Sequence, residues 1–129
     1  MPAYPGTDLA KILANNRQVY LWNNETVAAG ASIGSLSVSF ELERHNRSFY
    51  PWGLSVEVWF SEAPGTFEID IMGANNDSLG HYVQIGSIVA VNSSNVGRWD
   101  MATNIWPKYI AAYLKTLTNA VNVSAQASH

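Results

Sequence analysis

Residues 35–43 read SLSVSFELE, in which polar and apolar side chains alternate without interruption. A period of two places alternate side chains on one face of an extended strand, here Leu36, Val38, Phe40 and Leu42. The stretch GLSVEVWFS at residues 53–61 repeats the pattern, except that Trp59 interrupts its polar face. These two stretches predict a β protein whose strands each turn one face to a core.

Further strands follow from the same pattern. Residues 66–71 alternate after the turn at 63–65, so we expect a hairpin with residues 53–61. Residues 82–91 are strand-like, and Gly86 indicates either a bulge or a bend between two sheets; residues 96–101 form a short strand. A strand near Gln18 to Trp22 precedes all of these.

The segment 105–116 fits two patterns. Ile110, Tyr113, Leu114 and Leu117 would suit a helix that begins near Pro107, whereas strict alternation over 109–116 suits a strand. We favour the strand, because the turn at 117–119 leads into residues 120–127, which alternate and could pair with it as a C-terminal hairpin.

About eight strands separated by short polar turns predict an all-β antiparallel sandwich, and a jelly roll in particular. Two prolines and a glycine in residues 1–6 predict an extended N-terminal arm, and residues 8–14 predict one short helix. We therefore expect an arm and helix over residues 1–16 and a sandwich domain over residues 17–129.

The composition excludes several classes of function. Charged residues are 13% of the 129 residues, about half the usual ~25%, which excludes electrostatic binding of nucleic acid. The net charge of −3 is too weak to steer any charged partner strongly. Zero cysteines exclude disulfides and thiolate metal sites. Without a recognisable signal peptide or membrane span, we expect folding in the cytoplasm, without a membrane partner.

The residues that could carry catalysis are few and scattered. Glu57, Glu68 and Asp70 share the outward face of the expected hairpin, where we interpret them as solvated carboxylates. His45, His81 and His129 have no spacing typical of a zinc site. The loop from Asp70 to Asp77 is rich in oxygen ligands but lacks the spacing of an EF-hand. We expect no enzyme, no metal and no cofactor.

The aromatic residues are the most unusual feature, with five Trp and six Tyr. Rings outside a core mark protein interfaces or carbohydrate platforms, while others only close the core. We favour a protein interface over a sugar platform, and core closure comes third. The candidate interface residues are Tyr4, Trp52, Trp59, Trp99 and Trp106.

In this combination of arm, short helix, cysteine-free sandwich and Ser/Asn-rich surface, the sequence resembles the jelly-roll cement, or decoration, proteins of tailed bacteriophage capsids. The segments at residues 67–83 and 105–121 look like paired sandwich strands of such proteins. The resemblance implies a non-enzymatic virion protein that folds in the host cytoplasm. It would then bind the major capsid protein on the outside of the shell, as a homodimer or homotrimer.

Carbohydrate-binding modules of the galactose-binding-like type share this succession of short strands and polar turns. The alternative is therefore a β-sandwich module that uses its rim aromatics to bind a glycan. An aromatic strip on one sheet or at one end of the sandwich would favour this alternative.

Overall fold

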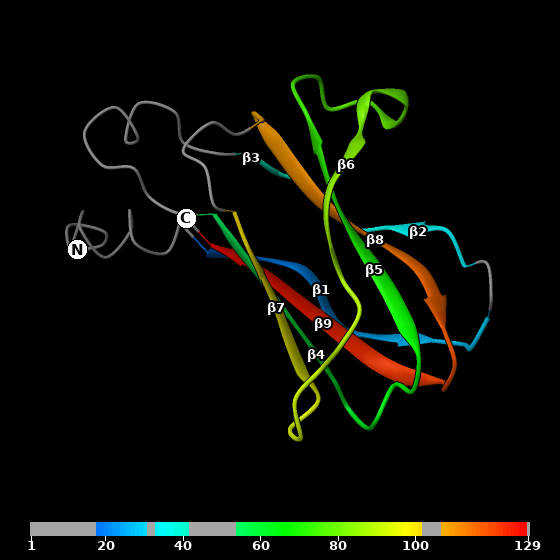
Figure 1. Ribbon diagram of the computed structural model, residues 1–129. Coiled ribbons are helices and arrows are strands. Elements are labelled where there is room, and N and C mark those ends of the chain that lie inside the picture. Colours follow the sequence, from blue (N-terminus) through cyan, green and yellow to red (C-terminus); the bar gives the residue numbers. More distant parts are fainter. Residues whose placement is uncertain (1–17, 31–32, 42–53, 102–106, 129) are drawn as a thin grey trace, which may run out of the picture.

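The computed structural model describes residues 18–30, 33–41, 54–101 and 107–128, which form two antiparallel β-sheets packed face to face (Figure 1). The predicted sandwich is confirmed. In chain order the described elements are β1 (Gln18–Val27), β2 (Ser35–Leu36), β3 (Phe40–Glu41), β4 (Ser55–Phe60), β5 (Phe67–Ala74), the 3-10 turn η1 (Leu79–His81), β6 (Val83–Ile88), β7 (Val96–Asp100), β8 (Tyr109–Leu117) and β9 (Val121–Ser128).

The strand order is that of a jelly roll. Sheet A has the order β1-β9-β4-β7, and sheet B has the order β2-β8-β5-β6, with β3 also paired to β8. The antiparallel pairs are nested along the chain: β1 with β9, β2 and β3 with β8, β4 with β7, and β5 with β6. Such nesting describes one long hairpin rolled into two sheets, which is the jelly-roll topology.

The core lies between the sheets and is built from the predicted alternation. In β4 the side chains of Val56, Val58 and Phe60 are buried while those between them are partly exposed. β9 contributes small side chains, Ala125 and Ala127, opposite these bulky residues. Burial of the apolar faces of both sheets supplies the main driving force for this fold.

Residues 35–41 do not form one regular strand, and Leu42 of the same predicted face lies outside the described residues. Leu36 pairs with Tyr113 but Phe40 pairs with Ile110, so four steps on this edge oppose three on β8. The extra residue is a bulge: Phe40 faces the core, whereas Leu36 shares the outer face with Tyr113, and Val38 is 61% exposed. The prediction that these residues share one inward face is wrong.

Hydrogen bonds between Ser37 and Ala112 explain the bulge. The backbone N–H of Ser37 donates to the carbonyl of Ala112 at 2.8 Å, and the N–H of Ala112 donates to the hydroxyl of Ser37 at 2.9 Å. A serine side chain thus replaces a backbone acceptor in the ladder. The alternation in the sequence could not reveal that a side-chain hydroxyl accepts this backbone hydrogen bond.

Both predicted hairpins are also wrong. β4 pairs within sheet A and β5 within sheet B, and the same separation holds for β9 and β8. The turn from β4 to β5 and the turn from β8 to β9 both cross from one sheet to the other, and hydrogen bonds join them. Thr118 donates from its N–H and its hydroxyl to the carbonyl of Thr66, at 2.9 and 2.8 Å. Alternation identifies a strand, but it does not choose the strand's partner.

Two other predictions in the sheets are confirmed. The segment at residues 109–117 is strand β8, not a helix. Of the two alternatives at Gly86, the bulge is found, as a register shift between Gly86 and Gln84 in the pairing of β6 with β5. The predicted arm at residues 1–6 and the helix at residues 8–14 lie outside the described residues.

Candidate functional site

Of the five candidate interface residues, Trp59 and Trp99 lie in the described part of the chain, both on sheet A. Tyr4, Trp52 and Trp106 lie outside it. The positions of the flanking strand ends are nevertheless described, and they define where the corresponding segments attach.

Those strand ends meet at one end of the sandwich. In sheet A, Gln18 pairs with Ser128, and Ser55 pairs with both Ser128 and Asp100. In sheet B, Glu41 pairs with Tyr109. Figure 1 shows both groups of strand ends on the left side of the view. The segments that carry Tyr4, Trp52 and Trp106 therefore attach to the same end, which we call the docking end.

Trp99 faces the core. It pairs with the buried Val56, and a Cβ atom on Gly86 would collide with its indole ring. The ring thus fills the space that glycine leaves on β6 and closes the sandwich between β6 and β7. Core closure, the third of the uses considered for the aromatic residues, describes Trp99 best.

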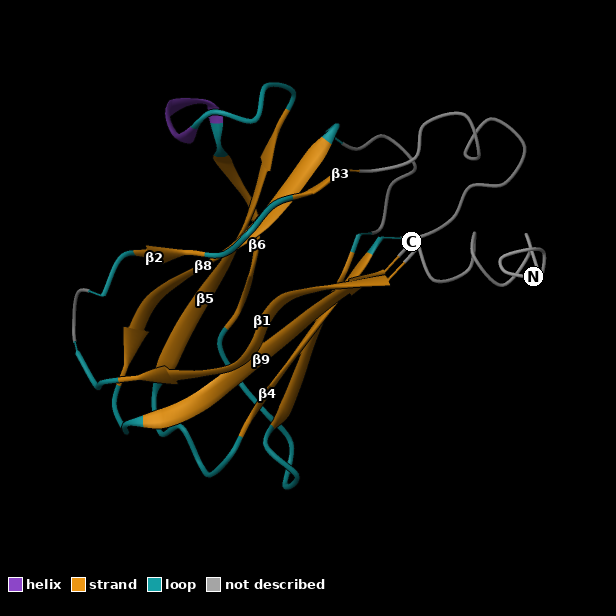
Figure 2. Ribbon diagram, turned by 180° about the vertical axis from the view of Figure 1, so that it is seen from behind, coloured by secondary structure: helices purple, strands orange, loops and turns teal. Residues whose placement is uncertain are grey.

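Trp59 lies on the outer face of sheet A, where it meets a ring that sequence reasoning missed. The ring centroids of Trp59 and Tyr20 are 6.0 Å apart at an interplanar angle of 66°, an edge-to-face contact. Tyr20 is 46% exposed. The two rings form an aromatic corner, and Figure 2 shows their strands, β4 and β1, on either side of β9.

A bulge in β1 explains why Tyr20 faces outward. Tyr20 pairs with Gln126 and Trp22 with Ala125, so two steps on β1 match one on β9. The two rings therefore point to opposite faces, and Trp22 is 8% exposed within the core. A second register shift follows at Asn24, which has a positive φ of 53°. The pair Asn23-Asn24 inside the strand was the available signal in the sequence for this second shift.

The three carboxylates do not form one cluster. Glu57 lies on sheet A opposite Arg98 and Gln126, whereas Glu68 and Asp70 lie on β5 in sheet B. The expectation that all three share the outward face of one hairpin is wrong, because β4 and β5 belong to different sheets. Asp70 is also not solvated as expected, since it is only 6% exposed.

Asp70 and Glu68 interact on the outer face of sheet B. Burial and the hydrogen bond with Glu68 raise the pKa of Asp70 to about 6. The same hydrogen bond, together with Lys115 at 3.6 Å, lowers the pKa of Glu68. The amide of Gln84 donates to Asp70 Oδ1 at 3.2 Å. These groups thus bind one another on the outer face of sheet B.

The loop at residues 75–82 is held by hydrogen bonds within it and to residues of other segments. Tyr82 donates to Asp77 Oδ1 at 2.6 Å, and the hydroxyl of Ser39 donates to Asp77 Oδ2 at 3.0 Å. Burial and the bond to Asp77 raise the pKa of Tyr82 to about 12. Among the described residues, no three His, Cys, Asp or Glu side chains are grouped so that they could hold a metal ion.

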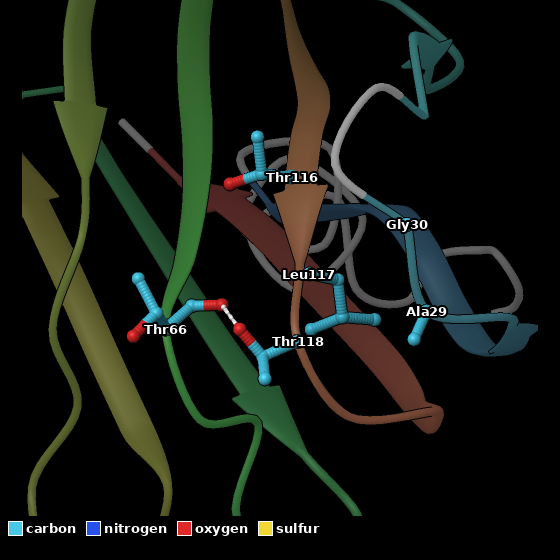
Figure 3. Close-up of a pocket in the computed structure, with 6 residues that line it drawn as sticks. All are labelled: Ala29, Gly30, Thr66, Thr116, Leu117 and Thr118. Carbon is cyan, nitrogen blue, oxygen red and sulfur yellow. Dashed lines mark hydrogen bonds between the residues drawn. The ribbon is translucent and has the colours of Figure 1, made fainter.

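A shallow pocket of about 450 Å³ lies beside the two crossing turns (Figure 3). It has no titratable side chain to act as an acid or a base, and its lining residues are Ala29, Gly30, Thr66, Thr116, Leu117 and Thr118. In the described part of the chain, no helix is long and apolar enough to span a membrane.

No protein-family model and no curated protein matches the sequence. Among solved structures, the chain is similar to the crystal structure of SPBc2 prophage-derived protein YomS, with a TM-score of 0.47 and 12% identity. The match covers 87% of this chain and 93% of that one. Function therefore has to be inferred from the residues and geometry of this chain.

Proposed function

We propose that this chain is a non-enzymatic structural protein, a decoration protein that binds the outside of a phage capsid through its docking end. The observation that carries the proposal is the meeting of strand ends at one end of the sandwich. Three of the candidate anchors, Tyr4, Trp52 and Trp106, belong to the segments that attach there. Aromatic residues in a charge-poor sequence suit protein contact, because they cost little to desolvate.

A decoration protein gains binding strength when one oligomer contacts several copies of the shell subunit. A homodimer or homotrimer that engages several symmetry-related copies of the major capsid protein binds with avidity, although each contact is modest. The proposed location is the virion surface, after folding in the host cytoplasm.

The test uses shells assembled from the major capsid protein of the same genome. Purified chain should sediment with these shells and raise the temperature at which they rupture. Trp52→Ala, Trp106→Ala and deletion of residues 1–6 should each weaken sedimentation. Trp99→Phe, at a core position on sheet A, serves as the control. A chain that stays monomeric and never sediments with shells contradicts the proposal.

A further inference from the structure

The aromatic corner of Trp59 and Tyr20 is a feature that the docking end does not use. The inner faces of β4 and β9 are fully buried here, so the strands that carry and separate the two rings are fixed in place. Between the rings, β9 carries Ser124 and Gln126 on its outer face, where Ser124 is 5% exposed and Gln126 is partly exposed. The corner is therefore preorganised.

The polar groups beside the corner are free to bind a ligand. Gln126 and Glu57 are cross-strand neighbours, and neither side chain makes a hydrogen bond or ion pair with the other described residues. Arg98, the other neighbour of Glu57, pairs instead with Asp100 at 3.0 Å. An amide and a carboxylate thus lie next to each other on the strands that carry and separate the rings, with hydrogen-bonding capacity unused.

We propose that this corner binds a neutral sugar ring of an oligosaccharide. The apolar C–H face of a pyranose stacks on an aromatic ring, and its hydroxyls can donate to Glu57 and exchange hydrogen bonds with Gln126. An acidic sugar would bring a second negative charge beside Glu57, which disfavours it. Two rings and two polar groups also match a small ligand better than a protein partner, which buries about 800 Å² per side.

The experiment titrates the intact protein with defined probes. The neutral probes are hexasaccharides of glucose with α-1,4 and β-1,4 linkage, of mannose and of N-acetylglucosamine, and the acidic probes are oligogalacturonate and sialyllactose. Indole N–H signals are followed by NMR, and Trp59→Phe assigns the signal of Trp59. We expect at least one neutral probe to bind and to shift the Trp59 signal more than the Trp99 signal.

Variants then locate the site. Trp59→Ala should weaken binding about tenfold, the loss expected for one stacked ring. Gln126→Ala should weaken it less, and Tyr113→Ala, an aromatic change on the outer face of sheet B, should leave it unchanged. Melting temperatures confirm that each variant is folded.

Three results overturn the proposal: no neutral probe binds at millimolar concentration, only acidic probes bind, or binding survives in Trp59→Ala. The proposal is independent of capsid decoration, since Trp59→Ala should still sediment with shells. If Trp59→Ala no longer sediments with shells while the wild type binds no sugar, the corner is a protein contact and the sugar proposal is wrong.

Discussion

Trp59 and Trp99 lie on neighbouring strands of sheet A, yet they face opposite sides of it. Trp99 pairs with the buried Val56 and covers Gly86, whereas Trp59 pairs with the outward Ser124 and meets Tyr20. The residue type is the same, so position in the alternation decides whether the ring stabilises the fold or remains available for binding. The two tryptophans should therefore separate stability from binding in experiments.

The largest expected effect on stability is that of Trp99→Ala. Removing this partly buried ring opens a cavity against the core and should lower the free energy of unfolding by about 3 kcal/mol. Gly86→Ala should also lower the free energy of unfolding, because the new Cβ collides with the indole of Trp99. Urea denaturation of both variants and of the double variant tests the contact: the Gly86 change should cost much less once Trp99 is removed. Additive losses would contradict the packing.

The outer face of sheet B provides the next test, because there the side chains bind each other. Asp70 has a pKa raised from 3.8 to about 6, so the folded state holds its proton more tightly than the unfolded chain. Its stabilising contribution is complete below pH 3.8 and is lost as the pH rises through about 6. Asp70→Asn should therefore raise the melting temperature at pH 8 and raise it much less at pH 5.

The pKa of the neighbouring Glu68 shifts in the opposite direction to that of Asp70. The lowered pKa of Glu68 contributes stability above its ordinary value of 4.5, and that contribution is lost in acid. Glu68→Gln should therefore not reproduce the gain at pH 8, which makes it the matched control. Equal gains for both variants would contradict the assignment of the raised pKa to Asp70.

A smaller loss is expected from Ser124→Ala. The hydroxyl of Ser124, which is 5% exposed, accepts the backbone N–H of Asn24 at 2.9 Å, at the second register shift of β1. Its removal leaves that N–H without its acceptor and should cost about 1 kcal/mol. Ser124→Thr, which keeps the hydroxyl, is the control. Hydrogen exchange of the Asn24 amide should accelerate in the alanine variant alone.

The sequence predicted strands better than it predicted their neighbours. The inward positions Val56, Val58 and Phe60 follow directly from alternation, because one face of β4 must enter the core. The partners of β4 could not be predicted in this way, since turns that cross a sandwich use the same residues as hairpin turns. The same limit applied to the candidate site residues. Alternation identified Trp59 on a polar face, but the bulge that separates Tyr20 from Trp22 appears only in the register of β1 with β9.

The smallest stability effect is expected from Trp59→Ala, and this small effect is what distinguishes Trp59 from Trp99. The ring lies on the outer face and its edge-to-face contact with Tyr20 is worth about 1 kcal/mol or less. The free energy of unfolding should change by no more than this, while the Trp99→Ala loss is about three times larger. Urea denaturation at pH 7 measures both. A loss for Trp59→Ala as large as that for Trp99→Ala would mean that the aromatic corner belongs to the folding core, and it would then be a poor candidate for ligand binding.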